Sequence, residues 1–146
     1  MYQIIQTKVL KVKEAKEAKV RTPEDARDYC SDIADLSQES FQILTVNARN
    51  NVIDRHMITL GLADASLIHP REVYRACIKD GAMACILVHN HPSGDTTPSS
   101  EDIRITKQLI EAGKIIDIKP LDHIILAKQN GIVKVLSMRE NGLCQF

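Results

Sequence analysis

The sequence contains no tryptophan, and aromatic residues make up only 3% of its 146 residues. Aromatic side chains are the usual platforms on which single-stranded nucleic acids stack, so the chain offers few such platforms. An excess of either charge is also absent, because 19 lysines and arginines balance 19 aspartates and glutamates. Overall charge therefore provides no attraction for nucleic acid or for an anionic membrane surface.

Long hydrophobic runs are absent as well. No apolar run approaches the roughly 20 residues that a membrane-spanning helix needs. Residues 1–20 alternate apolar side chains with lysines instead of forming the apolar centre of a signal peptide. The four cysteines form no Cys-x-x-Cys pair, so we expect no structural disulfide, and Cys85 is expected in the core. These absences predict a cytoplasmic protein with no membrane partner.

The chain is long enough to bury one sizeable hydrophobic core. Its 44% hydrophobic and 26% charged residues are the proportions of an ordinary globular protein. No internal repeat, long linker or low-complexity segment divides the sequence. We therefore predict a single domain over residues 1–146.

Strand-like and helix-like segments alternate along the chain. Thr22 followed by Pro23 predicts a helix start, Pro70 predicts another, and Gly113 predicts a helix end. The expected elements are strands at 1–17, 39–46, 52–60, 83–90, 115–127 and 132–138, and helices at 22–36, 70–81 and 99–113. This order predicts an α/β (mixed α+β) fold, in which helices flank one mixed sheet.

The segment ILVHNHPSGDTTPSSED places two histidines at the end of an apolar strand pattern. Side chains at positions i and i+2 of a strand share one face, so His89 and His91 can point toward one place. The following loop is rich in proline and glycine, and the next helix begins near Ser99 with Asp102 in its first turn. Two imidazoles and one carboxylate suit zinc, which keeps a fourth position for water in catalytic sites.

The same residues also have ordinary structural explanations. Ser99 and Asp102 have the spacing of a capping box, in which each side chain bonds the other residue's backbone N–H at a helix start. A histidine at a strand end is commonly a hydrogen-bonded surface or core residue, and Pro-Ser-Gly-Asp is a common turn composition. From these residues alone, a metal site and a capped helix beside structural histidines both stay open.

The spacing H-x-H-x(7)-S-x(2)-D of His89, His91, Ser99 and Asp102 resembles the zinc signature of the JAMM metallopeptidase superfamily, also called JAB or MPN-plus. HNHPSGD followed by PSSED, with HPREVYRACI before and LDHIIL after, resembles the RadC family within it. The resemblance spans residues 25–137. It implies a JAMM/MPN-like fold, which is a cytidine-deaminase-like, three-layer arrangement of a curved mixed sheet flanked by helices.

The resemblance also implies one zinc ion per chain, held by His89, His91 and Asp102. ESFQILTVN matches the family's upstream glutamate segment, so Glu39 would be the general base that activates the metal-bound water and protonates the leaving amine. Ser99 would donate a hydrogen bond to the developing oxyanion. The implied activity is that of a zinc metallopeptidase or isopeptidase, with a peptide or isopeptide substrate that the sequence does not name.

Two features of related proteins are not found in this sequence. Longer RadC proteins carry an N-terminal helix-hairpin-helix-like region that would bind DNA, whereas this chain starts almost at the catalytic domain. We therefore expect no such region and less support for a role in DNA repair. JAMM deubiquitinases grip ubiquitin with inserted segments, for which this chain has little room, so ubiquitin itself is not the expected substrate.

Two other function classes are kept as alternatives. A DNA-repair or recombination protein, or a metal-dependent nuclease, would find local support in the basic residues of 8–21, which equally suit the solvated face of an edge strand. A non-catalytic interaction module would need only the capped helix and two structural histidines. An exposed sheet edge could also pair two copies into a homo-oligomer.

The remaining polar residues of note have mainly structural interpretations. His123 is expected to be hydrogen-bonded near the sheet rather than to act as a fourth ligand, and His69 is expected at a helix start. His56 is expected to be exposed on a strand. Asn90 should point to the face of the sheet opposite the two neighbouring histidines. Arg71 has two open interpretations, a local salt bridge or a contact with substrate.

Overall fold

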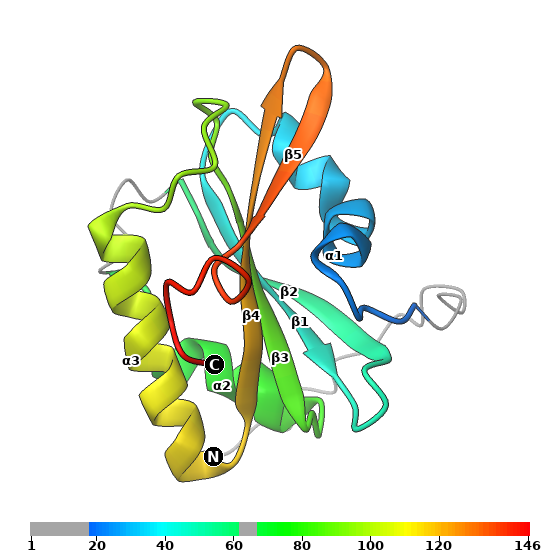
Figure 1. Ribbon diagram of the computed structural model, residues 1–146. Coiled ribbons are helices and arrows are strands. Elements are labelled where there is room, and N and C mark those ends of the chain that lie inside the picture. The colour runs from blue at the N-terminus through cyan, green and yellow to red at the C-terminus, as the bar shows by residue number, and fades with distance from the viewer. Residues whose placement is uncertain (1–17, 62–66) are drawn as a thin grey trace, which may run out of the picture.

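A computed structural model of the chain describes residues 18–61 and 67–146 (Figure 1). The strand expected over residues 1–17 lies outside the described residues. In chain order the elements are α1 (Pro23–Cys30), the 3-10 helix η1 (Ser31–Asp35), β1 (Ser40–Val46), β2 (Val52–Leu60), α2 (Pro70–Lys79), β3 (Ala84–Asn90), α3 (Ser100–Ile116), β4 (Lys119–Gln129) and β5 (Ile132–Ser137). The expected order of elements is confirmed within this part of the chain, with the first helix divided into α1 and η1.

The strands form one mixed sheet in the order β2-β1-β3-β4-β5. β1 pairs antiparallel with β2 and with β3, and β4 pairs antiparallel with β5, whereas β3 and β4 are parallel. A parallel pair needs a crossover connection, and α3 supplies it. β3 is the central strand, and all of its residues are buried, as its continuous apolar run predicts.

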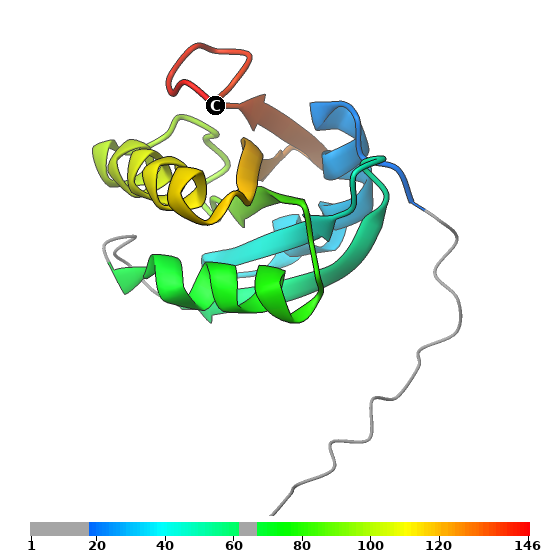
Figure 2. The same ribbon diagram turned by 90° about the horizontal axis from the view of Figure 1, so that it is seen from below.

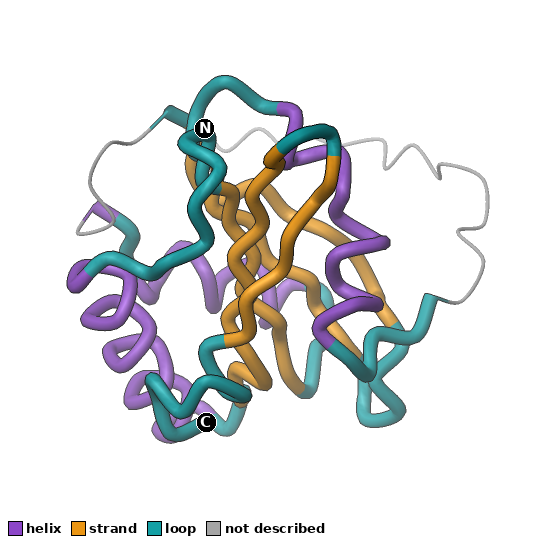
Figure 3. Tube along the Cα trace, turned by 45° about the horizontal axis from the view of Figure 1, so that its top comes forward, coloured by secondary structure: helices purple, strands orange, loops and turns teal. Residues whose placement is uncertain are grey.

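Helices cover both faces of this sheet and give the molecule three layers. α2 and α3 lie on one face and α1 lies on the other (Figures 1 and 3), and Figure 2 shows the same arrangement from below. The alternation of β3 sorts its side chains between these layers: Cys85 and Leu87 pack toward α2 and α3, while Ile86 and Val88 pack toward α1. The expected mixed sheet flanked by helices is therefore confirmed.

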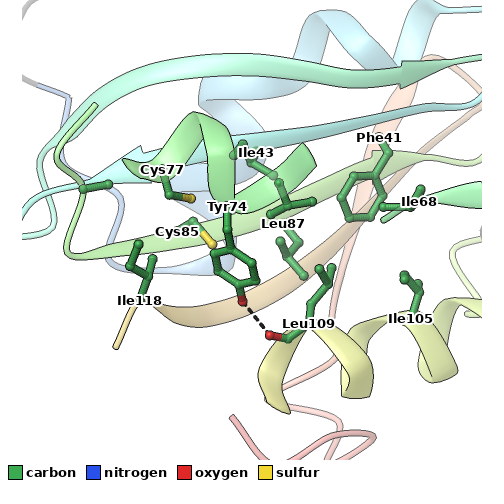
Figure 4. Packing of buried hydrophobic residues seen from close by; sticks show 12 residues of the cluster. Phe41, Ile43, Ile68, Tyr74, Cys77, Cys85, Leu87, Ile105, Leu109 and Ile118 are labelled. Carbon is green, nitrogen blue, oxygen red and sulfur yellow. Dashed lines mark hydrogen bonds between the residues drawn. The ribbon is translucent and has the colours of Figure 1, made fainter. Parts of the chain in front are cut away.

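The core beneath α2 and α3 connects both helices to the sheet (Figure 4). Phe41 of β1 and Leu87 of β3 pack with Ile105 and Leu109 of α3 in this cluster. The Tyr74 hydroxyl of α2 donates a hydrogen bond to the Leu109 carbonyl at 2.5 Å, so the buried phenol has a partner. This packing fixes the start of α3 against the end of β3, where the polar residues of interest lie.

The end of α3 differs from the prediction. The helix does not stop near Gly113 but continues through Ile116, so the first residues of the strand expected over 115–127 are helical. Asp117, with φ of 58°, ends the helix in the left-handed conformation. Gly113 is needed for another reason: a Cβ there would lie 2.4 Å from the Ile118 carbonyl oxygen and 2.6 Å from the Tyr74 hydroxyl.

Replacing Gly113 by alanine should therefore destabilise the fold. In an unhindered helix this change would be favourable, by up to about 1 kcal/mol, but overpacking of a filled site costs about 1–3 kcal/mol. Urea unfolding followed by circular dichroism measures the difference. Ile115→Ala, at an exposed site of the same helix, is the matched control and should change stability by no more than about 0.5 kcal/mol. Equal or higher stability of Gly113→Ala would contradict the close packing.

The four cysteines are free thiols, and all of them are buried. Cys85 is fully buried in the core, as predicted. Within residues 18–61 and 67–146, no helix has both the length and the apolar character needed to cross a membrane.

Candidate functional site

The two histidines lie at the carboxyl end of β3. The strand alternation places His89 on the face covered by α3, where its ring stacks against Phe41 with centroids 6.1 Å apart. His91 follows the last residue of β3, and its backbone N–H donates to the Leu126 carbonyl of β4 at 2.8 Å. The loop that follows leads into α3, whose first turn carries Asp102. The end of β3, the loop after it and the first turn of α3 follow one another in the sequence, and they bring the two histidines close to Asp102.

Donor atoms of the three predicted ligands meet at this place. Nε2 of His89 lies 2.8 Å from Nε2 of His91. Oδ2 of Asp102 lies 3.5 Å from the His89 nitrogen and 3.3 Å from the His91 nitrogen. His89 and Asp102 are buried, and His91 is half-buried. Two imidazole nitrogens and a carboxylate oxygen at this separation could bind one metal ion.

Hydrogen bonds determine which nitrogen of His89 carries its proton. The Thr106 hydroxyl donates to the Asp102 carbonyl at 2.6 Å, so it accepts from Nδ1 of His123, 2.5 Å away. Burial holds the pKa of His123 well below its ordinary value, so this ring is neutral and its Nε2 is an acceptor. That Nε2 lies 2.7 Å from Nδ1 of His89, which must donate. The lone pair on Nε2 of His89 therefore faces the other two ligands.

His91 is oriented in the same way. Its Nδ1 lies 2.7 Å from the carbonyl oxygen of Asp95, which can only accept a hydrogen bond. Neutral His89 and His91 would therefore direct two lone pairs at each other across 2.8 Å, and this arrangement needs a cation beside them. A metal ion or a proton can supply that charge. The donor set and its orientation fit a metal ion, since metal-binding histidines generally donate their second ring N–H to a fixed acceptor.

The protonation of His91 follows from its neighbours. Burial alone would lower the pKa of this imidazole, but the hydrogen bonds to the Asp102 carboxylate and to the Asp95 carbonyl outweigh burial and raise the pKa. Burial alone would likewise raise the pKa of Asp102, but the neighbouring imidazoles of His89 and His91 hold it well below its ordinary value. The carboxylate is therefore ionised, and a proton is the metal's competitor at His91.

Asp102 also caps α3, so the two interpretations of its sequence position are compatible. Its Oδ2 accepts from the Ser99 backbone N–H at 2.9 Å, and the Ser99 Oγ accepts from the Asp102 N–H at 3.0 Å. These reciprocal bonds form the predicted capping box. The same Oδ2 atom faces both imidazoles. The helix start therefore holds the carboxylate in position to act as a ligand.

Glu39 lies immediately before β1, and its half-buried side chain lines a cavity of about 20 Å³. His89 and Asp102 line the same cavity. A cavity of this size has room for about one water molecule. The structure thus brings Glu39 next to two of the three candidate ligands. Ser99 lies outside this lining, at the start of α3 and in contact with Asp102.

Three supporting interactions were not predicted from the sequence. The Asp95 carbonyl orients His91, the Thr106 hydroxyl orients His123, and the Asn90 amide bonds to residues beside Glu39. His123 itself has the structural role that was expected. Thr106 follows Asp102 by one helical turn, and this i, i+4 spacing is a signal that could have identified it.

His56 corrects another prediction, because it is only partly exposed. Its Nε2 lies 2.6 Å from Oδ2 of Asp80 and 3.8 Å from Oδ2 of Asp54. The Thr45 hydroxyl donates to the same Asp80 oxygen at 2.7 Å. These contacts connect β1 and β2 to the residue that ends α2, and they give Oδ2 of Asp80 a partner on each of the two strands. His56 is partly covered because β2 packs beside the end of α2.

Two further residues lie at the start of α2. His69 is the residue before the helix, as expected, although its side chain makes no capping hydrogen bond. Arg71 is exposed in the first turn. A contact between Arg71 and substrate stays a prediction.

Comparison with known proteins places these residues in a family context. Residues 20–143 match the family described as RadC-like JAB domain. A UPF0758 protein of Geobacillus sp. strain WCH70 is 48% identical over 124 residues, which are 84% of this chain and 53% of that protein. A UPF0758 protein of Staphylococcus carnosus strain TM300 is 48% identical over 125 residues, which are 85% of this chain and 54% of that protein.

A third relative, a UPF0758 protein of Listeria monocytogenes serotype 4b, is 47% identical over 132 residues. The match covers 90% of this chain and 57% of that protein. The chain therefore spans about half the length of the curated relatives that it matches.

Proposed function

Because the chain belongs to the RadC-like JAB domain family, we propose that it is a zinc-dependent metallohydrolase that cleaves an amide bond of the peptide or isopeptide type. The observation that supports this proposal best is the shared cavity: Glu39, His89 and Asp102 line one space with room for about one water molecule. A carboxylate beside a three-ligand metal site is the arrangement that hydrolysis by an activated water requires.

The residues of the chain divide the chemical tasks among them. His89, His91 and Asp102 would hold the zinc ion, which when bound acts as a Lewis acid and makes water nucleophilic near neutral pH. Glu39 would take a proton from the attacking water and transfer it to the leaving amine. His123 and the Asp95 carbonyl would keep the two imidazole rings oriented.

Ser99 would stabilise the oxyanion that forms on the substrate. Its Oγ accepts a hydrogen bond from the Asp102 N–H, and this leaves the hydroxyl hydrogen free to donate. A donor directed at the developing negative charge lowers the barrier to amide hydrolysis. The capping contact would hold the serine in place for this role.

A substrate screen tests the proposal. The zinc-loaded chain is incubated with peptides, with isopeptide-linked peptides and with single- and double-stranded DNA, before and after removal of zinc by a chelator. We expect cleavage of an amide substrate that is lost with the metal and restored by zinc. Cleavage of DNA with no amide hydrolysis would instead favour a nuclease. Bound zinc with no hydrolysis of any substrate would favour a binding module.

Zinc affinity should depend on pH through His91. The pKa of His91 is raised above the ordinary value near 6.5, so at a pH below this raised pKa zinc must displace a proton from the His91 imidazole. We expect a constant affinity above the raised pKa and a loss of about tenfold per pH unit below it. Competition with a chromophoric chelator between pH 5.5 and 8 measures this. His69→Asn, which removes a histidine outside the site, should keep the same profile, and a flat profile in the wild type would contradict the prediction.

A further inference from the structure

We infer that Asn90 is a positioning residue, which holds Glu39 in place by binding the backbone on both sides of it. The inference rests on the proposed function, because it assumes that Glu39 takes a proton from the water that attacks the substrate. Asn90 lies between His89 and His91, and its side chain, 1% exposed, points to the opposite face of the sheet. It cannot bind the same metal ion as its neighbours.

The Asn90 amide contacts both neighbours of Glu39 in the chain. Its Oδ1 accepts from the Ser40 backbone N–H at 2.7 Å and from the Ser40 hydroxyl at 3.0 Å. Its Nδ2 donates to the Gln38 carbonyl at 2.9 Å. The carbonyl of Glu39 itself accepts from the Gly61 N–H at 2.8 Å. Three backbone groups around Glu39 are therefore held, two of them by one side chain.

The Asn90 side chain supplies hydrogen bonds to the start of β1, beyond the last backbone pair between β1 and β3. The pairing of β1 with β3 begins at Phe41 and His89, so it does not include Ser40. The Asn90 amide supplies the acceptor that the Ser40 N–H needs and the donor that the Gln38 carbonyl needs. Aspartate would lack the donor, and alanine would remove the partner of the buried Ser40 N–H and of the part-buried Gln38 carbonyl.

The consequence is that the base and a metal ligand share one rigid support. His89 and Asn90 are adjacent on the central strand, so the backbone that orients the imidazole also orients the amide. A misplacement of about 1 Å at a reacting group can reduce a rate about a hundredfold. Loss of the amide should therefore affect turnover and leave metal binding intact.

The experiment compares Asn90→Ala and Asn90→Ser with Ile86→Val. Ile86 is the matched control, because it lies on the same strand and face but packs in the apolar core. Zinc content, kcat, KM and amide hydrogen exchange at Ser40 are measured for each protein. We expect unchanged zinc, nearly unchanged KM, kcat lowered about tenfold to a hundredfold, and faster exchange at Ser40 in the Asn90 variants. Ile86→Val should keep wild-type values of all four.

Each outcome bears on the inference separately from the proposed function. Wild-type kcat in the Asn90 variants would overturn the inference, as would an equal loss of kcat in Ile86→Val at matched stability. If Asn90→Ala does not fold, Asn90→Ser decides, because its hydroxyl retains one hydrogen-bonding group. If the wild type hydrolyses no amide bond, the proposed function fails. Unchanged hydrogen exchange at the Ser40 amide in the Asn90 variants would show independently that Asn90 does not hold the backbone beside Glu39.

Discussion

Replacing Glu39 by glutamine should leave the zinc in place and lower amide hydrolysis by about 10²–10⁴-fold. Glutamine has nearly the shape of glutamate but cannot take up a proton at neutral pH. Glu39 is not among the three residues whose donor atoms converge, so the metal content should not change. Elemental analysis and kcat/KM measured on one preparation check both parts of this result.

A second carboxylate serves as the control for this substitution. Glu111→Gln changes an exposed residue of α3 that is paired with Lys114, and it should retain full activity and full zinc content. Undiminished hydrolysis by Glu39→Gln would remove Glu39 from the reaction. Loss of zinc from Glu39→Gln would instead make Glu39 a ligand or a support of the metal.

The double substitution His89→Ala with His91→Ala should reduce bound zinc from about one ion per chain to nearly none. It removes two of the three converging donor atoms and leaves a single carboxylate, whose oxygen already accepts a helix-capping bond. Hydrolysis should disappear together with the metal. Zinc is measured by elemental analysis of proteins purified side by side without added metal.

The matched control removes two other histidines. His56→Ala with His69→Ala abolishes the contact between His56 and Asp80 but leaves the candidate site untouched. It should retain about one zinc ion. Zinc that persisted in the first variant and disappeared in this control would move the metal site to Asp54, His56 and Asp80. Absence of zinc from the wild type, even after reloading, would mean that the protein has the family's fold but no metal chemistry.

Local patterns predicted most of the fold, because they reflect burial within single elements. The continuous apolar run of β3 corresponds to a strand buried on both faces, and Thr22 and Pro23 do begin α1. The end of α3 could not be predicted in this way. A glycine near a helix end ordinarily indicates a stop, whereas Gly113 is required by contact with Tyr74 of another helix.

The candidate site shows the same division between local and long-range information. The i, i+2 positions of His89 and His91 and the helix-start position of Asp102 predicted their convergence. The expected position of Glu39 came from the family resemblance alone, since it depends on the pairing of β1 with β3. Strand order also determines the contacts of Asn90 with Gln38 and Ser40 at the start of β1, and no spacing in the sequence encodes that order.

β3 is paired along both sides, so its backbone hydrogen bonds should open only when the whole sheet opens. His91 and the first turn of α3, which carries Asp102, in contrast flank the loop over residues 92–99, which belongs to no helix or strand. We therefore expect a bound ion to exchange with solvent through movement of this loop while His89 stays fixed. The release rate would then be independent of global unfolding, and stabilising the core would not slow the loss of metal.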